Sequence, residues 1–267
     1  MMNKKIGFIG GGNMGSAMMS GIVKTGVCEA ANVWVYDVYA PARERLHNEL
    51  GVSTTDSIEE LIATAEVIVL AVKPQVLPSV LEQYGTLITE DKLVISIAAG
   101  ITLGRLTGLL SEKNKIVRVM PNTPAMVGAG MSGICVNANV SEEEKQEVLE
   151  MFCCFGRAEF VPEKLIDAVV GVSGSSPAYV YMFIEALADG AVAEGMPRAQ
   201  AYTFAAQAVL GSAKMVLESG KHPGELKDMV CSPAGTTIEA VRTLEEGKMR
   251  AVVMNAVHVA AEKNRNM

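Results

Sequence analysis

Residues 5–15 read KIGFIGGGNMG, in which a short apolar strand leads into a glycine-rich turn and then into a helical pattern. The turn has the form G-x-G-x-x-G and lies where that motif requires, between a strand and a helix. Glycines at these places make the tight turn, let the backbone approach a pyrophosphate and pack the helix against the strand. The stretch therefore predicts a Rossmann-type domain that binds a dinucleotide. A Rossmann domain that no longer binds its ligand is the alternative.

An acidic residue follows the second expected strand. Residues 32–36 (NVWVY) form that strand, and Asp37 comes directly after it. A carboxylate at this place accepts hydrogen bonds from the 2′-hydroxyl of an adenosine ribose. Strand, turn, helix and acidic residue are therefore in the register that dinucleotide binding requires.

Composition fits an enzyme with an ample apolar core. The chain has 267 residues, of which 49% are hydrophobic, and its formal net charge is −7. That charge, without a basic patch interleaved with aromatic residues, argues against a nucleic-acid partner. The first apolar stretch ends at residue 9, so neither a signal peptide nor a membrane span is expected, and we predict a cytoplasmic protein. The five cysteines form no C-x-x-C pair and lie apart from the histidines, which predicts reduced thiols and no metal site.

Strand and helix patterns divide the chain in two. Up to residue 161, short β-branched runs alternate with helical patterns, among them a helix over 141–155 that Ser141 and Glu144 open with a capping box. This alternation predicts a parallel sheet with helices on both faces. After Asp167 only helices are expected, over 177–194, 198–218, 223–229, 236–246 and 248–263. We therefore predict an α/β fold with a dinucleotide-binding domain at 1–162 and an all-helical domain at 163–267.

The expected C-terminal helices have apolar residues on more than one face, for example over 201–217. A domain of this size has too little interior to bury such helices alone. An interleaved dimer is therefore predicted, with a tightly packed monomeric bundle as the alternative.

Residues 226–241 (LKDMVCSPAGTTIEAV) place the small-residue turn Ser232-Pro233-Ala234-Gly235 directly before a helix that opens with two threonines. Backbone N–H groups in the first turn of a helix have no intrahelical partner, and the helix dipole favours negative charge there. A carboxylate can dock at such a turn, and Thr236 and Thr237 add two hydroxyls. An ordinary helix cap is the alternative.

Two further loops follow strands of the expected sheet, at the carboxyl edge where ligands of open α/β sheets bind. They are Ala71-Val72-Lys73-Pro74 and residues 120–124, which include Asn122. On the sequence alone, a solvated charge explains Lys73 as well as a ligand contact does. In the same way, the cap of a turn explains Asn122 as well as a ligand contact does.

Eight motifs spread over nearly the whole chain resemble pyrroline-5-carboxylate reductase. They are IGFIGGGNMG, AVKPQ, SIAAG, RVMPNTP, LIDAVVGVSGSSPAY, ALADGAVAEGMPR, HPGELKDMV and SPAGTTIEAV. The resemblance implies a Rossmann domain, a helical dimerisation domain, and dimers that often assemble further into decamers. It also implies reduction of 1-pyrroline-5-carboxylate to L-proline with NADPH or NADH, as the last step of proline biosynthesis.

That chemistry suits the residues present. An iminium is already electrophilic, so the enzyme needs no strong acid, and hydroxyls and amides suffice. We expect the turn with Ser232 and Gly235, together with Thr236, to hold the substrate carboxylate. Thr237 is expected to place its hydroxyl near the ring nitrogen, as the matching threonine is thought to do in the family. The resemblance also places Glu163 near the substrate, although an exposed, solvated carboxylate is the simpler interpretation.

The resemblance also implies a set of cofactor contacts. These are Ile9, Gly10, Gly11, Gly12, Asn13 and Met14 at the pyrophosphate; Asp37 and Ser57 near the adenosine; and Ala71, Val72, Lys73, Pro74, Ile97, Ala98 and Ala99 on the nicotinamide side, with Asn122 on a neighbouring loop. Many family members carry a small polar or basic residue where this chain has Asp37. A carboxylate repels a 2′-phosphate, which predicts a lean toward NADH that Arg43 and Arg45 could moderate.

Two other functions fit parts of the sequence. A β-hydroxyacid dehydrogenase also joins a Rossmann domain to helices, but it would carry a lysine and an asparagine in the helix after a glycine-rich turn. Residues 171–190 have neither. A nucleotide-sensing protein without catalysis is the other alternative, which the intact Thr237 turn disfavours.

Overall fold

The computed structural model describes residues 3–267, and its contacts divide the chain into two compact units. The sheet unit runs up to Gly174 and includes Ala260–Met267, and the helical unit is Ser175–Val259. By these contacts residues 163–174 and 260–267 pack with the sheet. The functional division at residue 162 stays a prediction.

An eight-stranded sheet forms the centre of the sheet unit, with the order β3-β2-β1-β4-β5-β6-β7-β8. The strands are β1 (Ile6–Ile9), β2 (Val33–Tyr36), β3 (Ser53–Thr55), β4 (Val67–Leu70), β5 (Leu93–Ser96), β6 (Lys115–Met120), β7 (Gly130–Val136) and β8 (Gly156–Phe160). The expected parallel sheet is confirmed for the first six strands. β7 is instead antiparallel to β6, and β8 follows β7 in parallel. The link 121–129 explains the reversal, because a parallel return needs a crossover of about a dozen residues or more.

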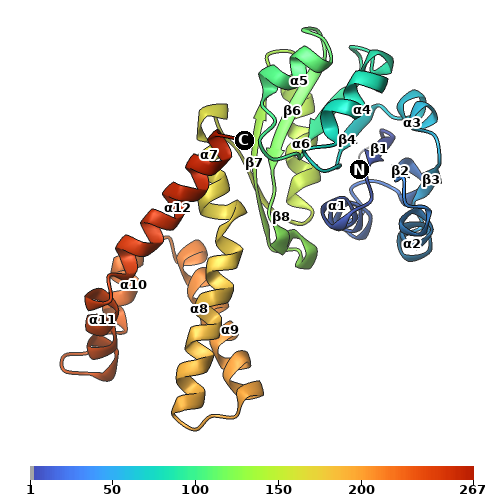
Figure 1. Cartoon of the computed structure of the whole chain (residues 1–267). Coiled ribbons are helices and arrows are strands. Elements are labelled where there is room, and N and C mark those ends of the chain that lie inside the picture. Colours follow the sequence, from blue (N-terminus) through green and yellow to red (C-terminus); the bar gives the residue numbers. More distant parts are fainter. Residues whose placement is uncertain (1–2) are drawn as a thin grey trace. The chain divides into compact units, whose positions relative to one another are not determined.

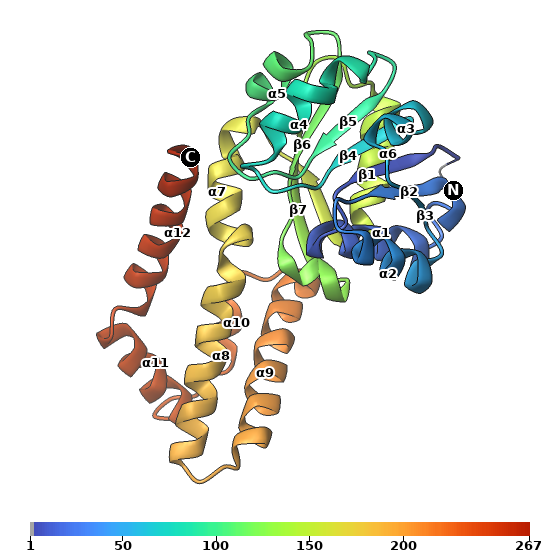
Figure 2. The same cartoon turned by 45° about the vertical axis from the view of Figure 1, so that its right-hand side comes forward.

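Helices cover both faces of this sheet (Figure 1 and Figure 2). One face packs against α1 (Asn13–Lys24), α2 (Ala40–Leu50) and α6 (Glu142–Cys153), and the other against α3 (Ile58–Thr64), α4 (Leu77–Tyr84) and α5 (Leu103–Leu109). Strand residues alternate between the two cores, so that Phe8 faces α1 while Ile9 faces α3. Both faces are buried, which explains why the central strands read as continuous apolar runs.

Short helical segments complete the sheet unit. They are η1 (Ala30–Asn32), η2 (Gly85–Leu87), η3 (Thr123–Val127), η4 (Glu163–Leu165), α7 (Ile166–Val169) and the π-helical turn η5 (Val170–Gly174). The capping box expected at α6 is present, since Ser141 Oγ accepts from the Glu144 amide while the Glu144 carboxylate accepts from the Ser141 amide.

The helical unit contains α8 (Ser176–Ala193), α9 (Arg198–Ser219), α10 (Pro223–Met229) and α11 (Thr236–Glu246), and most of α12 (Met249–Arg265). α8 and α9 lie side by side, with Ala188, Ala201 and Ala205 buried between them. The Tyr179 hydroxyl donates to the Ala256 carbonyl at 3.4 Å and links α8 to α12. The expected helices are thus confirmed with small shifts at their ends. No helix in residues 3–267 combines the length and apolarity needed to cross a membrane.

Candidate active site

The turn after β1 requires glycine at two places. Gly10 has a φ of +111°, and a Cβ built on it would lie 2.6 Å from the Ala71 carbonyl oxygen. A Cβ on Gly15 would lie 2.6 Å from the Gly10 carbonyl oxygen. The first glycine therefore permits the tight turn against β4, and the last permits α1 to pack onto the turn.

Gly12 is different, because no atom lies within 4 Å of a Cβ built on it. It is the N-cap of α1, and no side chain caps that helix. The first-turn N–H groups, which include those of Asn13 and Met14, therefore have neither an intrahelical partner nor a cap. Open backbone beside a positive helix end is the arrangement that binds a pyrophosphate.

Asp37 is fixed at the end of β2 by two backbone amides. Its Oδ2 accepts from the Gly11 N–H at 2.7 Å, and its Oδ1 accepts from the Tyr39 N–H at 2.9 Å. The Gly10 N–H donates to the Tyr36 carbonyl at 2.8 Å, which joins the glycine turn to the same strand end. The half-buried carboxylate thus stands beside the turn, where a ribose would lie.

A mostly apolar cavity of 420 Å³ opens between the ends of β1, β2 and β4. It brings together seven of the predicted cofactor residues, namely Ile9, Gly10, Gly12, Asp37, Ala71, Val72 and Lys73. The sequence reasoning missed its other walls, which are Tyr36, Val38, Ile58, Val76, Val80, Gln83 and Tyr84. A signal was present in Val76, Val80 and Tyr84, whose spacing of four places them on one face of a helix.

The remaining predicted cofactor residues lie outside this cavity. Ser57 caps α3, since its hydroxyl accepts from the Glu60 amide at 3.1 Å and donates to Glu59 at 2.9 Å. Gly11, Asn13, Met14 and Pro74 are neighbours in sequence of residues that line it, and Ile97, Ala98 and Ala99 follow the end of β5. Their contacts with a cofactor stay predictions.

Asn122 uses its side chain within the sheet unit. The Nδ2 group donates to the Ser173 carbonyl at 3.0 Å, and Oδ1 accepts from the Met131 amide at 2.8 Å. The residue is 9% exposed, so this amide joins the loop after β6 to the π-helical turn. A direct cofactor contact by Asn122 stays a prediction.

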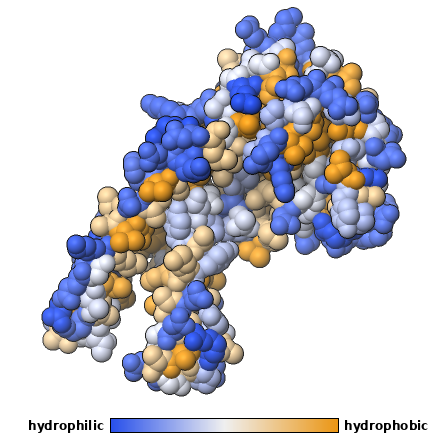
Figure 3. All heavy atoms as spheres, viewed as in Figure 1, coloured by the Kyte–Doolittle hydropathy of each residue, from blue (hydrophilic) through white to orange (hydrophobic). Residues whose placement is uncertain are grey.

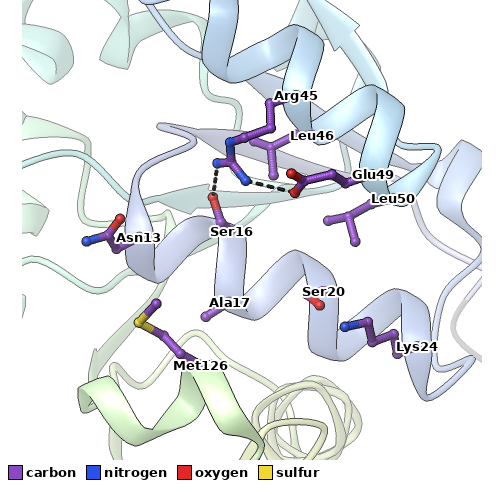
Figure 4. Close-up of a pocket in the computed structure, with 10 residues that line it drawn as sticks. All are labelled: Asn13, Ser16, Ala17, Ser20, Lys24, Arg45, Leu46, Glu49, Leu50 and Met126. Carbon is purple, nitrogen blue, oxygen red and sulfur yellow. Dashed lines mark hydrogen bonds and ion pairs between the residues drawn. The ribbon is translucent and has the colours of Figure 1, made fainter.

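A second cavity, of 580 Å³, lies between α1, α2 and η3 (Figure 4). There Arg45 points to Ser16, whose Oγ accepts at 3.0 Å, and to Glu49, whose Oε2 accepts at 2.9 Å. Arg43 donates to the Asp37 carbonyl. Both arginines that could moderate a preference between the two cofactors thus have partners within the chain.

In the helical unit, the turn before α11 has a defined backbone conformation. Ala234 has a left-handed φ of 55°, and the Gly235 N–H donates to the Ser232 carbonyl at 3.0 Å. Gly235 is the N-cap of α11, and no side chain caps this helix. A Cβ on Gly235 would lie 2.3 Å from Ser232 Oγ and 3.1 Å from the Ser232 carbonyl oxygen, so a larger residue there would displace the Ser232 hydroxyl.

Thr236 and Thr237 form the first turn of α11. Thr236 is exposed and Thr237 half-buried, and neither hydroxyl forms a hydrogen bond within residues 3–267. The first amides of α11 are therefore available to an anion, and the two hydroxyls are available to a ligand. Ser232, Gly235, Thr236 and Thr237 lie in this turn and the first turn of α11, and their contacts with substrate stay predictions.

Glu163 lies in the sheet unit, at the start of η4. Its Oε1 accepts from the Leu103 amide at 2.7 Å and from Arg118 Nη1 at 2.8 Å. Sequence reasoning missed Arg118, although a charged residue inside the apolar strand KIVRVM was a signal. A contact between Glu163 and substrate stays a prediction.

Comparison with known proteins agrees with the dinucleotide site. The family model described as "NADP oxidoreductase coenzyme F420-dependent" matches residues 5–100, which contain the glycine turn, Asp37 and the loop after β4. Fold and site together define a nicotinamide-dependent oxidoreductase.

The particular family follows from matches to the whole chain. The family model "Pyrroline-5-carboxylate reductase dimerisation" matches residues 163–267. Pyrroline-5-carboxylate reductase of Escherichia coli (strain K12) is 53% identical over 100% of this chain and 99% of the relative. The chain belongs to the pyrroline-5-carboxylate reductase family.

Solved structures give the same result. A pyrroline-5-carboxylate reductase from Coxiella burnetii superposes with a TM-score of 0.93 at 32% identity, covering 99% of this chain and 98% of that one. A Plasmodium falciparum pyrroline carboxylate reductase with NADP bound has a TM-score of 0.88 at 37% identity, covering 100% and 98%. The fold and the family assignment therefore agree.

Proposed function

We propose that this chain reduces the C=N bond of 1-pyrroline-5-carboxylate to give L-proline, as the last step of proline biosynthesis. The observation that carries the proposal is the first turn of α11, which has uncapped amides and two threonine hydroxyls that form no hydrogen bond within residues 3–267. Family membership supplies the substrate class, since relatives over the full length of the chain are pyrroline-5-carboxylate reductases.

The substrate carboxylate binds the turn formed by Ser232, Gly235 and Thr236 in this proposal. The amides of Thr236 and Thr237 donate to it, and the dipole of α11 favours its charge. No basic side chain is needed. Because Ala234 is left-handed and the Gly235 N–H donates to the Ser232 carbonyl, the turn has a defined shape and its amides are already aligned before substrate arrives.

Thr237 acts on the ring nitrogen. Its hydroxyl oxygen accepts a hydrogen bond from the protonated imine nitrogen. This bond orients the ring and stabilises the N–H that the product amine retains. A protonated imine is electrophilic enough to need no histidine or lysine as general acid. Thr237 is therefore the residue we assign to catalysis.

The residues of the sheet unit fit a dinucleotide. The open space at Gly12 and the uncapped start of α1 suit a pyrophosphate, and the carboxylate of Asp37 suits a ribose. Asn13, Met14 and Pro74 extend these contacts, and Ile97, Ala98 and Ala99 border the nicotinamide side in this proposal. When bound, the reduced cofactor supplies the hydride that the imine carbon takes up.

We propose that NADH is preferred over NADPH. The Asp37 carboxylate would lie close to a 2′-phosphate and repel it. Arg45 supports the proposal because its guanidinium is turned toward Ser16 and Glu49 (Figure 4).

Self-association through the helical unit is also part of the proposal. Figure 3 shows apolar side chains at the surface of its helices. The apolar side chains of this unit that are more than half exposed include Tyr181, Met182, Phe204, Leu210, Val252 and Met254. Such a surface fits a dimer, and the family resemblance adds a decamer as a higher assembly. A cytoplasmic location accords with the five free thiols.

Turnover assays test the reaction. The purified chain should oxidise NADH only when 1-pyrroline-5-carboxylate is present, and proline should accumulate in equal amount. Loss of the reduced-nicotinamide absorbance measures NADH oxidation, and amino-acid analysis measures the proline formed. Absence of turnover with both cofactors, in a chain that binds NADH, would refute the proposed reaction. Light scattering at low protein concentration tests the assembly, and a stable monomer would refute the dimer.

A further inference from the structure

We infer that Glu163 is a positioning residue, which with Arg118 holds the loop 97–102 in place for the nicotinamide half of the cofactor. The inference rests on the proposed dinucleotide site. In this inference Glu163 acts by holding the loop 97–102, and it makes no direct contact with substrate.

The loop 97–102 lies on the carboxyl edge of the sheet. It follows β5, which is the second strand from β1 on the side away from β2. Asp37 at the end of β2 marks the adenosine side, so an extended dinucleotide that crosses the glycine turn reaches β4 and β5 with its nicotinamide. The position of this loop therefore sets one wall of the nicotinamide site.

The loop ends at α5, where Glu163 acts as an external cap. Thr102 caps the helix by accepting from the Arg105 amide at 3.1 Å. The Leu103 amide is one of the first-turn N–H groups that lack a partner within the helix, and Glu163 Oε1 accepts from it at 2.7 Å. A residue far along the chain thus fixes the point where the loop becomes a helix.

Arg118 in turn fixes Glu163. The Arg118 side chain is 7% exposed and donates to the same Oε1 at 2.8 Å. Burial, and then the nearby Glu163 carboxylate, raise the pKa of the Cys135 thiol to about 11, so that thiol stays neutral and does not compete for Arg118. Removing the Glu163 charge leaves a buried cation without its partner, which disturbs its surroundings more than losing an exposed pair would.

A second restraint acts on the middle of the loop. Gly100 has a φ of +74°, and a Cβ built on it would lie 3.2 Å from Met267 Cβ. Asn264, which is 6% exposed, anchors this end of the chain by donating to Asp167 at 2.7 Å. The loop is therefore held at its helical end by Glu163 and covered at Gly100 by Met267.

The test compares Glu163→Gln with the double variant Arg118→Gln/Glu163→Gln. Each is assayed for its Kd for NADH, from NADH fluorescence, and for kcat and both KM values. Glutamine keeps an oxygen that accepts but carries no charge, so we expect Glu163→Gln to lower kcat/KM for NADH roughly tenfold, as weakening hydrogen bonds to a charged group does. At saturating NADH, the KM for 1-pyrroline-5-carboxylate should stay within about twofold of the native value. The double variant leaves no unpaired buried charge, and it should recover most of the lost kcat/KM.

A matched control is available on the same strand. Lys115 of β6 pairs with Glu144 at 2.7 Å, at the end of the strand away from the loop. Glu144→Gln breaks that pair and should lower stability while leaving the kinetic constants for NADH unchanged.

Two results would overturn the inference. One is a rise in the imine KM in both variants with the Kd for NADH unchanged, which would place Glu163 on the substrate. The other is a fall in melting temperature alone, with native kinetics. Because NADH binding is measured without the imine, failure of this inference is distinguishable from failure of the proposed reaction. If Glu163→Gln does not fold, the double variant is used alone. A raised KM for the imine would indicate a substrate contact by Glu163, and an unchanged KM would indicate the positioning role.

Discussion

Replacing Gly12 by alanine should damage cofactor binding while sparing the fold. Gly12 has φ −68° and ψ −172°, an extended conformation that alanine adopts freely, and a Cβ there meets no atom within 4 Å. Alanine is a poorer N-cap than glycine, but it also restricts the unfolded chain, and these opposing effects leave a net change within about 1 kcal/mol. The melting temperature should shift by only about 2–4 °C.

The effect on NADH follows from the same open space. A methyl group at Gly12 would project where the pyrophosphate approaches the start of α1. Displacing one phosphate oxygen from one amide costs about 1.5–3 kcal/mol, or roughly 10–150-fold in Kd. Fluorescence titration with NADH measures the change in Kd, and thermal unfolding measures the change in stability.

Gly10→Ala is the matched comparison, two residues away. Its Cβ would lie 2.6 Å from the Ala71 carbonyl oxygen, at a φ of +111°. This variant should lose about 2 kcal/mol of stability or more, because both strain and overlap act on the folded state. The reasoning is refuted if Gly12→Ala binds NADH as the native chain does, or if Gly10→Ala is as stable as the native chain.

Three further predictions concern single side chains. Thr237→Ala should lower kcat by about tenfold or more while Thr237→Ser keeps most of it, because only the hydroxyl is required; equal kcat in all three proteins would exclude the assigned role. Asp37→Ser should raise the ratio of kcat/KM for NADPH to that for NADH by about tenfold or more, since one carboxylate–phosphate repulsion is removed; a native chain that already prefers NADPH would contradict this. Burial raises the pKa of Glu144, but hydrogen bonds from Lys115 and Ser141 outweigh it and hold that pKa below its ordinary value of 4.5. The stability that Glu144 contributes is therefore present above that value and lost as pH falls below it. In Glu144→Gln the free energy of unfolding should fall less steeply as the solution is acidified. A pH dependence equal to that of the native chain would contradict this prediction.

Local chemistry made much of the fold predictable. The left-handed φ at Gly10 and the close packing at Gly15 both demand glycine, so the turn is visible in the sequence itself. The same holds for the capping box of Ser141 and Glu144, in which two residues three apart satisfy each other. The start of α11 was predictable because the turn that ends at Gly235 and the two threonines that open the helix are neighbours in sequence.

Features that depend on distant residues were not predictable in this way. β3 (Ser53–Thr55) is short and polar and carries no apolar periodicity, and it forms because β2 offers an edge to pair with. The reversal of β7 follows from the length of its link to β6. The pair of Arg118 and Glu163 joins residues 45 apart, and no local pattern connects them. The site was thus predictable where backbone geometry determines it, and missed where side chains meet across the fold.

Deuterium transfer from NADH to proline tests the central claim most directly. The chain would be incubated with 1-pyrroline-5-carboxylate and NADH deuterated on the transferred face of nicotinamide C4, and the product analysed by mass spectrometry and NMR. We predict L-proline with one deuterium on the ring carbon that was the imine carbon. Proline without deuterium, or no proline from a chain that binds NADH, would contradict hydride transfer to this substrate.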